Sequence, residues 1–113
     1  MKITAHSYGD VKVLALKGDL TTGEGDVKLR DTLKEEVGAG FKKIIINLGG
    51  VGFMDSGGLG ELMAGFTSCK KAGASVCLAS LTKKTHDLLQ ITQLITLFDV
   101  YEDDKEAIAS FVK

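Results

Sequence analysis

The segment that most constrains the fold is an apolar run that leads through glycines into a helical pattern. Residues 42–50 read KKIIINLGG, a stretch of strand length that is rich in β-branched side chains. Such a run suits a strand that is covered on both faces of a sheet. The apolar side chains that follow recur at spacings of three and four, which is one face of a helix: Leu59, Leu62, Met63 and Phe66. A buried strand followed by an amphipathic helix predicts one repeat of an α/β sheet.

The rest of the chain continues this alternation. Strands are expected at 3–8, 11–18, 74–80 and 95–101, and helices at 24–37, 82–91 and 103–113. A Gly-Asp turn signal between the first two strands predicts a hairpin, which makes the sheet mixed rather than purely parallel. Thr82 is a candidate cap for the helix that follows it. The predicted order is ββαβαβαβα, an α/β fold with about five strands and about four helices.

Length and charge limit the classes of function. The 113 residues suit a single domain over 1–113 that buries roughly 65% of its unfolded surface. The net charge is −1 and the lysines occur in separated pairs, which argues against direct nucleic-acid binding or a polybasic membrane anchor. No apolar stretch approaches the ~20 residues that span a bilayer, and the N-terminus lacks the apolar core of a signal peptide. We therefore expect a cytoplasmic protein that does not insert into a membrane.

The two cysteines give no sign of a metal site. Cys69 falls in a helix pattern and Cys77 in an apolar run. A zinc site uses closer pairs of cysteines, with further Cys or His ligands. We therefore expect two reduced thiols, no metal and no cofactor.

Ser56 lies between the buried strand and the following helix, where α/β sheets carry their functional loops. As a nucleophile it fits poorly, because a nucleophile elbow has Gly two residues before the serine and this chain has Met54. The segment also lacks the Gly-Lys-Ser/Thr end of a phosphate-binding loop and the third glycine of the dinucleotide fingerprint. Catalysis is thus disfavoured, and nucleotide binding has weak support.

Two interpretations of Ser56 remain open from the residues alone: it caps the helix, or it is the substrate of a kinase. Gly57 and Gly58 remove side chains that would block a kinase. The N–H groups of Gly57, Gly58 and Leu59 could then hold the new phosphate. A plain cap does not explain two successive glycines in a first helical turn, because each costs up to ~1 kcal/mol relative to alanine.

The sequence FMDSGGLGEL at 53–62 resembles the Asp-Ser-x-Gly-Leu-Gly signature of the STAS domain, the family of anti-sigma-factor antagonists. LKGDLT at 16–21 is similar to the Gly-x-Leu segment that follows the second strand of the family, and residues 91–103 to its closing segment. The resemblance extends over nearly the whole chain. It implies a mixed sheet with helices packed mainly on one face, and a regulatory module rather than an enzyme.

The resemblance also implies a mechanism. Family members of this size bind an anti-sigma factor that is also a serine kinase, and that partner then releases its sigma factor. The kinase phosphorylates the serine that corresponds to Ser56, the modified form no longer binds, and a phosphatase restores it. The residues that the resemblance and the motif imply for partner binding are Asp19, Thr21, Thr22, Asp55, Gly57, Gly58 and Glu61, within the loop 19–25 and the start of the motif helix.

Thr21 and Gly57 depart from the family pattern, which often has Asp and Ser or Thr at these places. Leu59, Leu62 and Phe66 are expected in the core rather than at the contact surface. We expect a monomer or a weak homodimer. The alternatives are a STAS module of a signalling scaffold or of a lipid or anion transport system, and a nucleotide-binding regulatory domain.

Overall fold

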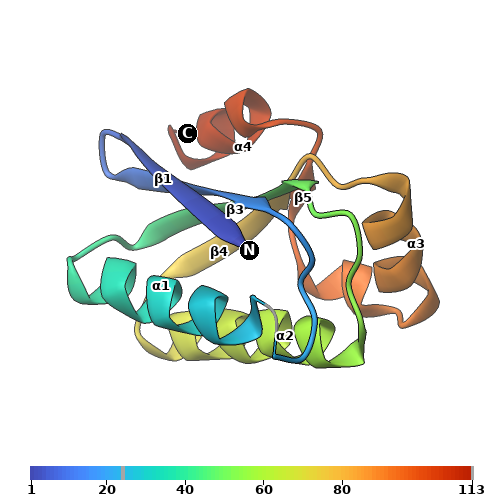
Figure 1. Cartoon of the computed structure of the whole chain (residues 1–113). Coiled ribbons are helices and arrows are strands. Elements are labelled where there is room, and N and C mark those ends of the chain that lie inside the picture. The colour runs from blue at the N-terminus through green and yellow to red at the C-terminus, as the bar shows by residue number, and fades with distance from the viewer. Residues whose placement is uncertain (24, 113) are drawn as a thin grey trace.

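The computed structural model describes residues 1–23 and 25–112, apart from the side chain of Val112, and shows a sheet flanked by helices (Figure 1). The strands are β1 (Lys2–Tyr8), β2 (Val11–Lys17), β3 (Lys43–Gly50), β4 (Ser75–Ala79) and β5 (Val100–Tyr101). The helices are α1 (Asp26–Gly38), α2 (Ser56–Lys71), α3 (Lys83–Ile91), the short 3₁₀ helix η1 (Leu94–Leu97) and α4 (Asp104–Val112). Glu24 and Lys113, which fall in two of the predicted helices, lie outside the described residues.

The strands lie in the order β1-β2-β3-β4-β5, so the described part of the chain forms one five-stranded mixed sheet. β1 pairs antiparallel with β2 as the predicted hairpin, and the other neighbouring pairs are parallel. Lys43 on β3 is in register with Val11 on β2 and with Ser75 on β4. The carboxyl ends of these strands therefore meet at one edge of the sheet, where α/β proteins place their functional loops.

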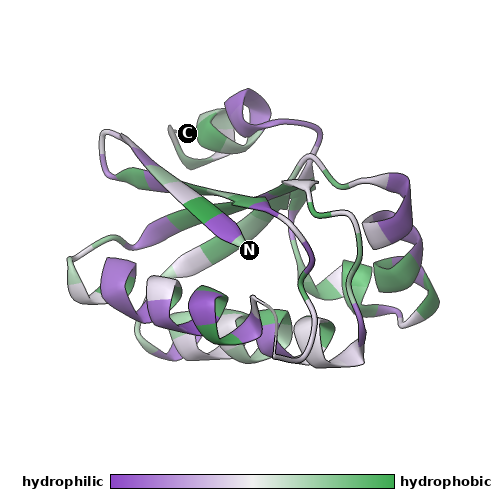
Figure 2. Cartoon of the chain, in the orientation of Figure 1, coloured by the Kyte–Doolittle hydropathy of each residue, from purple (hydrophilic) through white to green (hydrophobic). Residues whose placement is uncertain are grey.

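The central strands are buried on both faces, as the run of isoleucines predicts. Ile44 and Ile46 pack into one cluster with residues of α1, α2 and α3, while Ile45 packs on the opposite face against α4. All three side chains are at most 1% exposed. Figure 1 shows α1 and α2 on one side of the sheet and α4 on the other. Figure 2 shows apolar residues along the central strands and many hydrophilic ones on α1.

The last predicted strand, at 95–101, is mostly not a strand. Residues 94–97 form η1, which follows Gln93 in the left-handed region at φ 63°, and only Val100–Tyr101 pairs with β4. Phe98 explains the difference, because its buried ring packs edge-on against Phe66 with the centroids 4.8 Å apart. This contact with α2 takes precedence over the strand propensity of an apolar segment. Thr82 caps α3 as expected, its hydroxyl accepting from the N–H of Thr85 at 3.2 Å.

Candidate functional site

The Asp55-Ser56 segment lies at the carboxyl edge of β2 and β3, where two loops run side by side. The N–H of Gly18 donates to the carbonyl of Gly50 at 3.0 Å, and the N–H of Leu20 to that of Phe53 at 2.9 Å. The N–H of Asp55 donates back to the carbonyl of Leu20 at 3.4 Å. The two loops thus continue the pairing of their strands and place residues 18–22 directly beside the start of α2.

Asp55 caps α2, and the interpretation of Ser56 as the cap is wrong. The Oδ1 atom of Asp55 accepts from the N–H of Gly58 at 2.8 Å, the usual N-cap bond. Both carboxylate oxygens also lie 3.2 Å from the N–H of Thr22. These backbone donors, Gly58 foremost, lower the pKa of the Asp55 carboxyl, because they bind its charged form. One carboxylate therefore holds both the helix and the neighbouring loop.

Ser56 is the first residue of α2 and is exposed to solvent. Within the described residues, its hydroxyl forms no hydrogen bond with the protein. Gly58 and Leu59, two of the three residues whose N–H groups the sequence suggested as holders of a phosphate, already donate to Asp55. The backbone N–H of the third, Gly57, also contributes to lowering the pKa of the Asp55 carboxyl. A group added to Ser56 would therefore stand in solvent beside a carboxylate rather than in a cradle of N–H donors.

Gly57 and Gly58 are needed for packing. A Cβ atom on Gly57 would overlap Oγ1 of Thr22, and one on Gly58 would overlap the carbonyl oxygen of Leu20. The two glycines thus allow the loop after β2 to cross the first turn of α2 at backbone distance. The sequence predicts that these glycines leave room for a kinase, whereas in the structure the loop after β2 occupies the space where their side chains would lie.

The remaining predicted contact residues divide into two groups. Asp19 and Thr22 are exposed and Thr21 is half-buried, all in the loop beside Ser56, whereas Glu24 lies outside the described residues. Glu61 instead turns to α1, where its two oxygens accept from Nε and a terminal nitrogen of Arg30, both at 2.8 Å. The Arg30 guanidinium lowers the pKa of Glu61.

Sequence reasoning missed an apolar cleft whose lining includes Phe53 and Met54, in the loop before Ser56. Phe53 and Ile91, which are 54% and 80% exposed, line a cleft of about 330 Å³ between the β3–α2 loop and α3. Lys84 and Asp87 supply charges at its rim. The signal was present in the sequence, because Phe53 interrupts a glycine-rich loop three residues before Ser56.

As predicted, Leu59 and Leu62 are buried, and Phe66 packs against the same core.

A comparison with models of protein families shows to which family the chain belongs. The model of the STAS domain matches residues 2–107. The chain belongs to the STAS domain family. Among the described residues, no helix has the length and hydropathy to cross a membrane, and no group of three or more His, Cys, Asp or Glu is arranged to hold a metal ion.

Solved structures share the STAS fold at low sequence identity. A protein of Thermotoga maritima assigned as an anti-sigma factor antagonist superposes with a TM-score of 0.89 at 23% identity, over 98% of this chain and 95% of that one. An anti-sigma factor antagonist of Mycobacterium paratuberculosis gives 0.87 at 19% identity, over 99% and 94%. The phosphorylated form of SpoIIAA, a cell fate determinant of Bacillus, gives 0.74 at 19% identity, over 97% and 99%.

Proposed function

We propose that this STAS domain is an anti-sigma-factor antagonist whose binding to an anti-sigma factor with serine kinase activity is switched off by phosphorylation of Ser56. The observation that carries the proposal is the exposed Ser56 hydroxyl at the first position of α2, which makes no hydrogen bond within the described residues. A kinase needs access to such a hydroxyl. That SpoIIAA, which has the same fold, exists in a phosphorylated form supports the proposal.

The surface around Ser56 suits a reversible protein contact. Asp19 and Thr22 are exposed polar groups on one side, and the exposed ring of Phe53 lies three residues before Ser56 in the same loop. Interfaces commonly combine an aromatic anchor with a polar rim. We assign the partner contact to this surface, and we expect Gly57 and Gly58 to act indirectly, by holding the loop after β2 in place.

Phosphorylation would act at the interface rather than on the fold. It adds about −1.5 to −2 charges at neutral pH, next to the Asp55 carboxylate. Because Asp55 is already engaged by the N–H groups of Gly58 and Thr22, its charge remains in place beside the phosphate. Two adjacent negative groups that lose solvent against a partner can cost several kcal/mol, and each 1.4 kcal/mol is about tenfold in affinity.

Two measurements test the proposal. Mass spectrometry of the protein from its own cells should find phosphate on Ser56. The kinase that co-purifies with the protein should then bind Ser56→Ala with an affinity within about threefold of the unmodified protein. It should bind Ser56→Asp at least about tenfold more weakly.

Thr67→Asp is the matched control, because Thr67 is exposed on the same helix about three turns away. It adds the same charge and should leave the affinity unchanged. Equal affinities for Ser56→Ala and Ser56→Asp would refute the switch, and so would a kinase that transfers phosphate only to another residue.

A further inference from the structure

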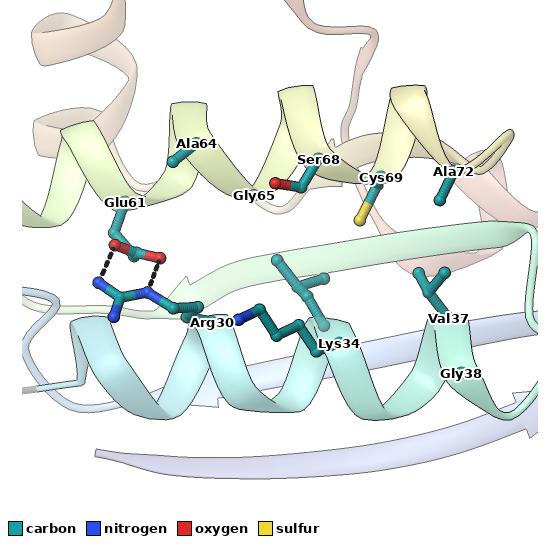
Figure 3. A pocket seen from close by; sticks show the side chains of 11 residues that line it. Arg30, Lys34, Val37, Gly38, Glu61, Ala64, Gly65, Ser68, Cys69 and Ala72 are labelled. Atoms are coloured by element: carbon teal, nitrogen blue, oxygen red, sulfur yellow. Dashed lines mark hydrogen bonds and ion pairs between the residues drawn. The ribbon is translucent and has the colours of Figure 1, made fainter.

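A second cavity lies between α1 and α2, away from Ser56. It has a volume of about 530 Å³ and opens along the groove between the two helices (Figure 3). Its floor is apolar and includes the buried side chains of Leu33 and Cys69. Ligand sites typically occupy 300–1,000 Å³ and combine apolar walls with a few polar groups, and this groove meets both conditions.

Small residues on α2 create the space. The wall that faces α1 is formed by Ala64, Gly65 and Ser68 on α2, and by Ala72 directly after its end. The helices touch at Gly65, where a Cβ atom would lie only 2.6 Å from Cδ1 of Leu33. Long charged side chains usually cover exposed apolar surface of this kind with their stems. Here no such side chain from α2 covers the wall between Glu61 and Ala72, and the groove stays open.

Charged groups mark one end of the groove. The Arg30–Glu61 pair closes that end. The Arg30 guanidinium neutralises the Glu61 carboxylate and donates two hydrogen bonds of 2.8 Å to it. Lys34 lies beside this pair, and its ammonium forms no ion pair or hydrogen bond within the described part of the chain (Figure 3). The lining thus carries two cations and one carboxylate, a net charge of +1. Asp26 and Asp31 also act on Arg30 but do not line the groove. Lys34 helps to lower the pKa of Glu61, but the Glu61 oxygens already accept two hydrogen bonds from Arg30, so Lys34 is the group that can receive an anion.

We propose that this groove binds an amphipathic monocarboxylate, with an alkyl chain between α1 and α2 and the carboxylate at the Lys34 ammonium. From Arg30 to Gly38, α1 advances about 12 Å, close to the length of a chain of roughly ten carbons. Nucleotides fit this groove poorly, because its walls offer few hydrogen-bonding groups to a base or a triphosphate. The site does not include Ser56, so this proposal does not depend on the proposed phosphorylation switch.

The test is a titration of the whole protein with sodium decanoate below its micellar concentration, followed by calorimetry and by NMR shifts of the backbone amides. Saturable binding is expected, with the largest shifts along residues 30–38 and 61–72. Octanoate should bind about four- to fifteenfold more weakly, since each buried methylene contributes up to about fourfold. Decanol, which has the chain without the charge, should bind about three- to tenfold more weakly.

Two pairs of variants locate the site. Ala64→Leu fills the groove and should abolish saturable binding, whereas Ala109→Leu, at an exposed position of α4, should leave it intact. Lys34→Gln should weaken decanoate binding about three- to tenfold without changing decanol binding, and the exposed Lys105→Gln should change neither.

Absence of saturable binding would overturn the proposal. So would shifts spread over α4 and the Phe53 cleft, which indicate adsorption to exposed apolar surface, or equal decanoate affinity in Ala64→Leu. If Ala64→Leu does not fold by circular dichroism, the chain-length series and the Lys34→Gln comparison still decide the matter.

Discussion

Replacing Gly58 with alanine tests the inference that the motif glycines serve backbone packing. In an unobstructed helix, this change would stabilise the protein by about 1 kcal/mol, because glycine is the poorer helix former. In this structure the added Cβ would overlap the carbonyl oxygen of Leu20 and lie 2.6 Å from its carbonyl carbon. Both atoms belong to the backbone, so a rotamer change cannot relieve the contact.

The expected magnitude follows from two opposing effects. Overpacking of a filled site costs about 1–3 kcal/mol. Displacing the Leu20 carbonyl also weakens its hydrogen bond with the N–H of Asp55, which costs about 1 kcal/mol more. After the gain in helix propensity, Gly58→Ala should lower the free energy of unfolding by about 2 kcal/mol, or roughly 8 °C in melting temperature for a domain of this size.

Gly60 provides a matched control in the same helix. A Cβ atom there would have no neighbour within 4 Å, so Gly60→Ala should stabilise the protein by about 1 kcal/mol. Urea denaturation of both variants measures the two changes, which should have opposite signs. If Gly58→Ala proves as stable as Gly60→Ala, the close approach of the Leu20 loop to α2 does not exist in solution and the packing argument fails.

Three further predictions follow from the site and the core. The pKa of Asp55 is lowered in the folded state, so its charge stabilises the protein above about pH 4, and this stabilisation is lost as the pH falls through the folded pKa. The difference in urea midpoint between the natural protein and Asp55→Asn should therefore disappear in acid. A difference that does not vary with pH would contradict this. Burial, together with the nearby Asp99 carboxylate, raises the pKa of Cys77 to about 12, and Cys69 is also buried. Both thiols should therefore resist modification by maleimide in the folded protein and react after unfolding. Rapid labelling of the native protein would contradict the burial of these thiols in the core. Phosphorylation of Ser56 should leave the melting temperature within about 10 °C of the value for the unmodified protein, because the phosphate stands in solvent. A larger fall in a thermal scan would show that the switch acts through unfolding.

Much of the fold could be read from local patterns. The isoleucines at 44–46 and the helical spacing from Leu59 to Phe66 are enough to define a buried strand and an amphipathic helix, and both are present. The place of Ser56 at the start of that helix follows from the same two patterns. The segment at 95–101 was harder, because an apolar stretch suits a strand or a buried turn equally well until the position of Phe66 is known.

Local sequence patterns define the alternation of strands and helices and the position of an Asp-Ser pair between two of them, since both depend on residues close together in the chain. Tertiary packing adds that Asp55 also binds the N–H of Thr22, that Gly57 and Gly58 accommodate the loop after β2, and that Glu61 pairs with Arg30. Each of these joins groups about thirty or more residues apart. Such contacts depend on how the layers pack, and side-chain periodicity along one segment carries no information about its distant neighbours.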